Sequence, residues 1–174
     1  EHGYNSCCLK GGMHVGTHMD APYHMIADGA FMSDMPVAQF FGRGRLIDAR
    51  GKAHVTKDLL DGIALAQGDI VLVLTGWYKK FGAPDYYDGF PEIAPAFAEH
   101  IAACGVAVLG LDTPSPDNAP FPIHKILLSK NVLIVENANN LGELVGVERF
   151  DVSAAPAKFQ WDAAPVRVVA HVKA

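Results

Sequence analysis

With 174 residues and a mass of 18.6 kDa, the chain is long enough for one globular domain with a substantial hydrophobic core. Half of its residues are hydrophobic and 19% are charged, a composition that argues against a disordered polypeptide. The net charge of −5 argues against a nucleic-acid-binding protein, which presents a basic surface to phosphates, and the apolar runs are too short to cross a bilayer.

The first third of the chain is irregular in pattern and contains a dense group of candidate metal ligands. Three histidines and one aspartate fall within eleven residues, namely His14, His18, Asp20 and His24. Imidazole nitrogens and carboxylate oxygens together are the ligands that zinc, manganese and iron use in proteins. All four residues have even numbers, so in an extended chain their side chains would face the same side.

An extended conformation with one bend explains this spacing better than a helix does. A helix would bring His14 and His18 together but would turn Asp20 away from them. Gly16 and Pro22 both disfavour a helix. In a straight strand, residues four apart lie roughly 13 Å from each other, too far to share one ion. We therefore expect a bend at Gly16, because glycine permits it.

Strand and helix patterns alternate from residue 45 onward. Residues 45–49 predict a short strand, and a helix capped by Thr56 is expected next. The apolar run Ile70–Leu74 predicts a strand that is buried on both faces. Residues 91–104 predict a helix, and residues 106–111 predict another strand.

Two loops have two open interpretations each. Residues 77–90 carry six aromatic side chains, which either line a pocket for a flat aromatic molecule or pack on the surface. Residues 112–122 are rich in proline and contain four polar residues that are either turn formers or substrate contacts: Asp112, Thr113, Ser115 and Asp117.

The last third of the chain adds two further candidate ligands. A short helix is predicted at residues 123–130, a buried strand at 132–135 and a closing strand at 166–172. His124 lies where the proline-rich loop enters the helix, and Glu136 ends the buried strand, where a carboxylate either serves a functional site or faces solvent. The mixture of strands and helices, without a strict repeat, predicts an α/β or α+β fold.

The segment His14-x-Gly-Thr-His18-x-Asp20-x-Pro22-x-His24 resembles the signature of the cyclase family, metal-dependent hydrolases that include bacterial kynurenine formamidase and isatin hydrolase. Two later stretches resemble the family as well: a histidine followed twelve residues later by a glutamate, and Ala-Pro-Val-Arg-Val-Val-Ala at 164–170. The resemblance implies a single domain over residues 1–174, with a mixed, barrel-like central sheet and flanking helices. Because the chain begins at Glu1 and family members extend further, we expect N-terminal residues to be missing.

The resemblance also implies a metal centre with one or two divalent ions. His14, His18 and Asp20 would hold a first ion. Asp20 and Glu136 would bridge to a second ion, which His124 would also bind. Zinc is the first expectation and manganese the second, since nitrogen and oxygen ligands suit both.

The implied activity is hydrolysis of the C–N amide bond of a small aromatic substrate, as in an arylformamidase. A cation held by imidazole and carboxylate makes water reactive near neutral pH and polarises the substrate carbonyl. His24 faces the same side but lies outside the ligand set, so it suits general acid–base catalysis, the role that the resemblance assigns. The alternative substrate is a cyclic amide, imide or lactone, as for isatin hydrolase.

A non-catalytic metal-binding homologue is the alternative outside the enzyme class. Such a protein would lack a ligand or the proton-transfer group, and this chain has all six residues. A structural zinc site is disfavoured because the thiolates of Cys7, Cys8 and Cys104 are not placed to serve. We expect these to be reduced thiols of a cytoplasmic protein. The expected partners are a small-molecule substrate and further copies in a homodimer or larger homo-oligomer, with no nucleic acid and no membrane.

Overall fold

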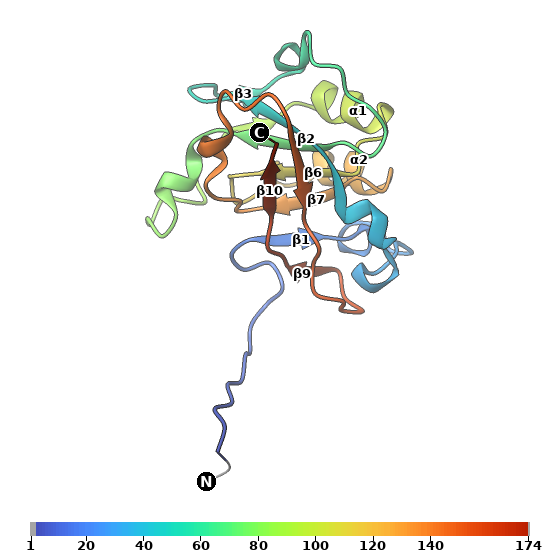
Figure 1. The fold of residues 1–174 in the computed structure, drawn as a ribbon, viewed down its shortest axis with the longest axis vertical. Coiled ribbons are helices and arrows are strands. Elements are labelled where there is room, and N and C mark those ends of the chain that lie inside the picture. The colour runs from blue at the N-terminus through green and yellow to red at the C-terminus, as the bar shows by residue number, and fades with distance from the viewer. Residues whose placement is uncertain (1–2, 174) are drawn as a thin grey trace.

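One curved, mixed β-sheet forms the centre of the computed structural model, which describes residues 3–173 (Figure 1). Within these residues the sheet has eight strands in the order β10-β8-β2-β4-β6-β7-β1-β9. Residues 1, 2 and 174, the ends of the expected domain, lie outside the described residues. The strands are β1 (His18–Asp20), β2 (Phe41–Asp48), β4 (Ile70–Leu74), β6 (Val108–Leu111), β7 (Leu133–Glu136), β8 (Phe150–Ser153), β9 (Ala163–Pro165) and β10 (Val169–Val172).

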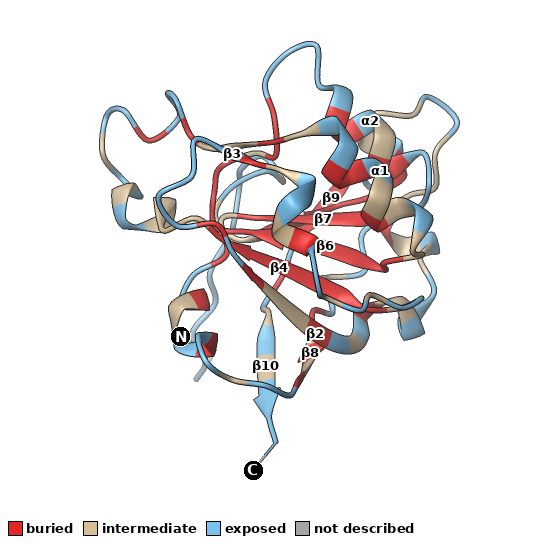
Figure 2. Ribbon diagram, turned by 90° about the horizontal axis from the view of Figure 1, so that it is seen from above, coloured by how far each residue is buried: buried red, intermediate tan, exposed pale blue. Residues whose placement is uncertain are grey.

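The middle of the sheet is parallel and buried on both faces. β2, β4, β6 and β7 pair in parallel, and every residue of β4 is buried, as its uninterrupted apolar run predicted. Figure 2 shows the helices α1 (Pro95–Ala103) and α2 (Pro122–Leu128) together over one face of these strands. Parallel strands need such cover because both of their faces are apolar.

Alternate side chains of the strands enter two apolar clusters, one on each face of the sheet. Val73 of β4 packs in the cluster that contains Phe97 of α1 and Ile123 of α2. Leu72 belongs to the cluster on the opposite face, together with Met19 of β1. Because side chains alternate along a strand, the neighbours of Met19 in β1 point toward the helix side of the sheet.

Antiparallel strands extend the sheet at both ends, and the whole curls into a half-barrel (Figure 1). β1 pairs with β7 and β9, and β8 pairs with β2 and β10. A second sheet consists of β3 (His54–Val55) and β5 (Glu92–Ile93). The expected mixed fold with a barrel-like sheet and flanking helices is confirmed. Between residues 3 and 173, no helix has the length and apolar character needed to cross a membrane.

The helices differ from the predicted ones in length. The helix expected after Thr56 is a single 3-10 turn, Lys57–Leu60, and the chain turns away at Gly62 with a φ of 79°. The helix predicted from residue 91 begins at Pro95, because Glu92–Ile93 is already paired as β5. In both places a turn or a paired strand sets the end of the helix, and neither can be predicted from the local spacing of apolar residues.

The strands differ where long-range pairing defines their ends. The strand predicted at 45–49 begins at Phe41, where β8, which was not predicted, pairs with it. The closing strand predicted at 166–172 begins only at Val169, as β10, which pairs with β8. A separate strand, β9, precedes it and pairs with β1; it was not predicted. The extended conformation expected for residues 14–24 holds only for His18–Asp20, because a 3-10 turn, Pro22–His24, follows.

Candidate metal centre

The register of β1 places two candidate ligands beside a third. His18 of β1 lies directly opposite Glu136 of β7, and its Nε2 is 3.2 Å from Oε2 of that glutamate. The same nitrogen is 3.5 Å from Oδ1 of Asp20, which points to the same face of the strand. Because β7 and β1 each have a paired strand on both sides, these three side chains start from a well-fixed backbone.

His124 reaches this group from the first turn of α2. Asp117 holds that turn, since its carboxylate accepts hydrogen bonds from the Ile123 backbone N–H and from Nδ1 of His124, each at 2.6 Å. Nε2 of His124 then lies 3.3 Å from Oε1 of Glu136 and 3.7 Å from Oδ2 of Asp20. The helix α2 therefore brings a candidate ligand to the two that β1 provides and the one that β7 provides.

His14 joins the group through the bend that was expected at Gly16. Gly16 has a φ of 66°, a left-handed conformation that favours glycine. Nδ1 of His14 consequently lies 3.1 Å from Oδ1 of Asp20 and 3.2 Å from Nε2 of His18. All five predicted ligands thus converge on one place, although only two of them belong to the same strand.

His24 also lies at the edge of this group. The 3-10 turn Pro22–His24, in which proline takes a helix-initiating position, brings its ring centroid within 4.2 Å of that of His14. Potential ligand atoms of His14, Asp20 and His24 lie within 4.8 Å of one another, as do those of His18, Asp20 and Glu136. Asp20 is common to both groups, which fits a bridging position.

In each of three histidines, His14, His18 and His124, one ring nitrogen donates a hydrogen bond to an oxygen outside the group of candidate ligands. His18 Nδ1 donates to the Gly16 carbonyl at 2.8 Å, His124 Nδ1 donates to Asp117, and His14 Nε2 donates to Oδ2 of Asp162 at 2.8 Å. Such outer contacts fix the ring and leave the other nitrogen free to bind a metal. Asp162 was not among the residues predicted from the sequence, although it lies just before the stretch 164–170 that resembles the family.

The charges of the group fit a cation. Asp20 is fully buried, and among the described residues neither of its oxygens accepts a hydrogen bond of good geometry. Burial favours the neutral acid, but His124 and His14 outweigh burial and hold the pKa of Asp20 below its ordinary value. Against the effect of burial, the hydrogen bond with Asp117 and the nearby carboxylates of Asp20 and Glu136 raise the pKa of His124 to about 11. Buried carboxylates that demand positive charge are the setting of a divalent metal site.

His24 differs from His14, His18 and His124 in its electrostatics. Burial lowers the pKa of His24, and the neighbouring His14 lowers it as well, although Asp20 opposes both. The side chain is 22% exposed, whereas His18 is 1% exposed. A neutral, partly accessible imidazole can accept a proton at neutral pH, which is the property a general base needs.

The polar side chains of the loop before α2 make hydrogen bonds within the protein. Asp112 accepts hydrogen bonds from the backbone and hydroxyl of Thr75 and from the Gly76 backbone. Thr113 and Ser115 donate to carbonyls two residues ahead. Thr113 and Ser115 therefore act as turn formers, Asp112 ties this loop to the end of β4, and Asp117 supports His124.

The aromatic loop is packed and also walls a cavity. Trp77 Nε1 donates to the Tyr86 carbonyl at 2.8 Å, and the Tyr86 hydroxyl donates to Asn137 at 2.6 Å. A cavity of about 190 Å³ lies between this loop and the bend at Gly16. Its aromatic walls are Tyr78, Phe81 and Tyr86.

Known proteins resemble the chain in sequence and in fold. Residues 6–118 match the model of the Cyclase family. Kynurenine formamidase of Paracidovorax citrulli is 32% identical over an alignment of 181 positions, which spans 98% of this chain and 81% of that protein. A solved structure described as a potential metal-dependent hydrolase with cyclase activity is 30% identical, with a TM-score of 0.81, over 94% of this chain and 81% of that one. An isatin hydrolase bound to the product analogue thioisatinate shares the fold, with a TM-score of 0.85 at 23% identity over 94% of this chain and 73% of that one. The chain therefore belongs to the cyclase family.

Proposed function

We propose that this protein is a metal-dependent hydrolase that cleaves the C–N amide bond of a small aromatic molecule such as an N-formyl anilide. The observation that carries the proposal is the fully buried carboxylate of Asp20, whose oxygens lack hydrogen bonds while imidazole nitrogens surround them. The relatedness to a kynurenine formamidase supports the choice of bond.

The residues suggest two adjoining metal positions. His14, His18 and Asp20 would hold one divalent ion, and Asp20, Glu136 and His124 would hold another. Zinc is our first choice and manganese the second, because imidazole and carboxylate suit both. When bound, such an ion supplies a more acidic water and a polarised carbonyl.

His24 would move the protons of the reaction. Its neutral imidazole accepts a proton from water as the new C–O bond forms at the carbonyl carbon. It then delivers that proton to the amide nitrogen as the C–N bond breaks, so that a carboxylic acid and an amine leave. The partial exposure of His24 gives it access to a substrate, whereas His18 is enclosed.

The substrate would lie near the aromatic loop, where Tyr78, Phe81 and Tyr86 wall a cavity beside the bend at Gly16. The second candidate activity is the opening of a cyclic amide, imide or lactone, which the likeness in fold to an isatin hydrolase suggests. The same chemistry serves both, since each begins with water adding to a carbonyl.

The test is a substrate panel on protein purified without chelator. Elemental analysis should find a divalent metal, and N-formylkynurenine should be hydrolysed faster than isatin or a simple lactone. Removal of the metal should abolish turnover, and zinc or manganese should restore it. Preference for isatin would move the assignment to the second candidate, and metal-free, inactive protein would refute the proposal.

We further propose a cytoplasmic homodimer or larger homo-oligomer that binds no nucleic acid. The three cysteines are free thiols, as in a reducing compartment. Light scattering coupled to gel filtration would measure the mass in solution, and a monomer would contradict the oligomer.

A further inference from the structure

Asp162 is fixed in space by the strand that it precedes. β9 begins at Ala163, which lies opposite Asp20 of β1, and the Ala21 backbone N–H donates to the Asp162 carbonyl at 2.8 Å. The Asp162 side chain therefore starts from a backbone position beside the segment that leads from Asp20 to His24. Its carboxylate is 36% exposed.

One oxygen of this carboxylate contacts two histidines of the site. Oδ2 of Asp162 lies 2.8 Å from Nε2 of His14 and 3.3 Å from Nδ1 of His24. The two rings lie against each other, with centroids 4.2 Å apart and planes tilted by 36°. A candidate metal ligand and the candidate acid–base group thus share one acceptor atom.

A carboxylate has no proton to give, so each imidazole nitrogen that bonds to it must carry the hydrogen. For neutral His14, this leaves the lone pair on Nδ1, the nitrogen that lies 3.1 Å from Asp20. For neutral His24, it leaves the lone pair on Nε2. A hydrogen bond at one imidazole nitrogen fixes which of the two nitrogens carries the proton. In His14 and His24, the same carboxylate oxygen makes that hydrogen bond.

We propose that Asp162 is a positioning residue that sets the tautomers of His14 and His24 together, so that one binds metal through Nδ1 and the other accepts protons at Nε2. The catalytic part of this inference rests on the proposed function. The tautomer of His24 is a property of the metal-free protein and does not rest on it.

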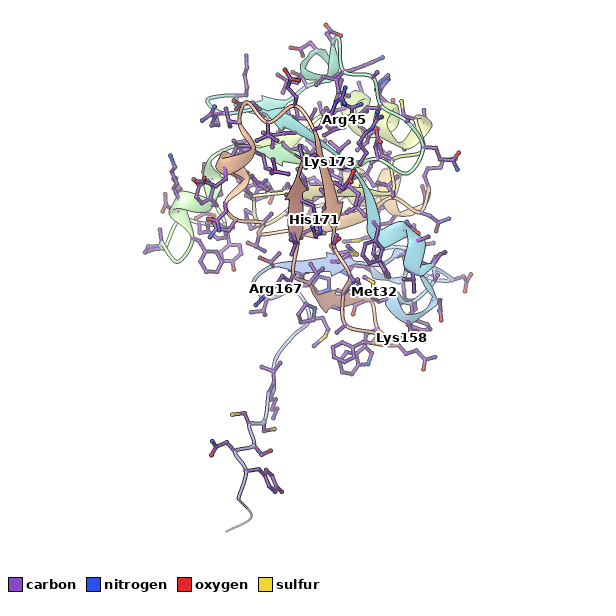
Figure 3. All side chains as sticks on the ribbon, viewed as in Figure 1. Met32, Arg45, Lys158, Arg167, His171 and Lys173 are labelled. Carbon is purple, nitrogen blue, oxygen red and sulfur yellow. The ribbon has the colours of Figure 1, made fainter. Side chains whose placement is uncertain are left out.

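The side chain of Asp162 is not needed to hold its own loop. Backbone hydrogen bonds already do so, from Met32 to the Trp161 carbonyl and from Ser33 to the Phe159 carbonyl, both at 2.9 Å. Figure 3 shows Met32 and Lys158 at the end of the molecule that carries β9, where both line one small cavity. Replacement of the carboxylate should therefore leave the loop in place.

The test compares the native protein with Asp162→Asn and with Asp48→Asn as a matched control. Asp48 is a similarly exposed aspartate at 42%, paired with Arg50 outside the site. Nitrogen-15 NMR of the metal-free protein, with His24 assigned through His24→Gln, should show the proton on Nδ1 in the native protein and in Asp48→Asn. Asp162→Asn should give a mixture of tautomers.

Metal affinity and kinetics give the second readout. Asp162→Asn should bind Zn²⁺ roughly 10- to 100-fold more weakly, as for the loss of an outer carboxylate partner, and its kcat should fall while KM changes little. Asp48→Asn should match the native protein in both.

The possible outcomes distinguish a failure of the role proposed for Asp162 from a failure of the proposed function. A native His24 protonated on Nε2, or an Asp162→Asn variant with native tautomer and native Zn²⁺ affinity, would overturn the inference. A variant that loses metal affinity but keeps the His24 tautomer would overturn the shared role. If the native protein binds no metal, the proposed function fails, and the NMR comparison still decides whether Asp162 sets His24.

Discussion

At the scale of single residues, the histidines of the centre divide into two kinds. His14, His18 and His124 each have one nitrogen held by an outer oxygen and the other turned toward buried carboxylates. His24 is partly accessible, and burial lowers its pKa, so it is neutral at neutral pH. The first arrangement suits metal binding, and the second suits proton transfer.

His24→Ala should keep its metal but lose turnover by roughly 100-fold or more, the usual contribution of a general acid–base group. Steady-state kcat and elemental analysis of the same sample measure the two effects. His54→Ala, a change of an exposed histidine in β3, serves as the control and should behave as native. Loss of metal from His24→Ala would instead make His24 a ligand.

At the scale of elements, the bend before β1 determines whether His14 reaches the other ligands. Gly16 has a φ of 66°, and a methyl group added there would meet no atom within 4 Å. Gly62 shares these properties, with a φ of 79° and open space, but lies away from the centre. A comparison of alanine variants at these two glycines therefore distinguishes the effect of backbone strain on stability from an effect on metal binding.

Gly16→Ala and Gly62→Ala should each lower the free energy of unfolding by about 1–2 kcal/mol, the cost of a left-handed alanine. Only Gly16→Ala should also weaken metal binding, because an ion must restore whatever part of the bend the metal-free variant has relaxed, at roughly tenfold for each 1.4 kcal/mol relieved. Calorimetric titration with Zn²⁺ and urea denaturation measure the two quantities. Equal Zn²⁺ affinities in the two variants would show that His14 does not depend on the bend.

A second element-scale feature ties β2 to the start of β4. Asp69 is 3% exposed and accepts hydrogen bonds from Nε and Nη2 of Arg43 at 2.9 and 2.7 Å, and from the Ala66 backbone at 2.9 Å. Burial tends to raise the pKa of Asp69, but Arg43 outweighs burial and the pKa lies below its ordinary value. The ionised carboxylate is therefore the form that stabilises the fold.

Asp69→Asn should lower the free energy of unfolding of the metal-free protein by about 1–3 kcal/mol at neutral pH. Since the folded-state pKa is depressed, the stabilisation is complete above the ordinary aspartate value of 3.8 and is lost as pH falls through the lower folded value. Denaturation of both proteins between pH 7 and pH 2 should show the difference shrinking only at the acid end. A difference that is constant with pH would contradict this account.

At the scale of the whole molecule, the centre links parts of the chain that are far apart in sequence. The bend and β1 supply three ligands, α2 supplies His124, and the end of β7 supplies Glu136. A metal bound there joins two neighbouring strands near one end of the sheet, β7 and β1, to the helix layer. Folding and metal binding should therefore be coupled.

Free Zn²⁺ held at 100 times its Kd should stabilise the native protein by about 2.7 kcal/mol relative to the chelated protein, provided that the unfolded chain binds little zinc. Urea denaturation in zinc buffers measures this shift. Asp20→Ala and Glu136→Ala should purify without metal and show no such response. Full metal content in either variant would count against the centre.

The motif and the strand β4 were predictable because both are local. An apolar run of five residues reads as a buried strand wherever it lies, and β4 has the predicted bounds. The ligands His14, His18 and Asp20 stand close enough in sequence for their spacing to be informative, and Gly16 marked the bend. β8 and the 3-10 turn after Thr56 were missed or misjudged, because their pairing and ends depend on distant partners.

By itself, the sequence determined the kinds of side chain at the centre, the bend that lets three of them meet, and the family to which the chain belongs. Only the tertiary structure decided which oxygens stand behind the histidines, since Asp162 is 148 residues away from His14 along the chain and 2.8 Å away in space. The antiparallel pairing of β1 with β9 brings them together. Local sequence patterns indicate which chemistry a side chain can perform. Contacts between distant segments depend instead on which strands pair in the folded sheet and in which register.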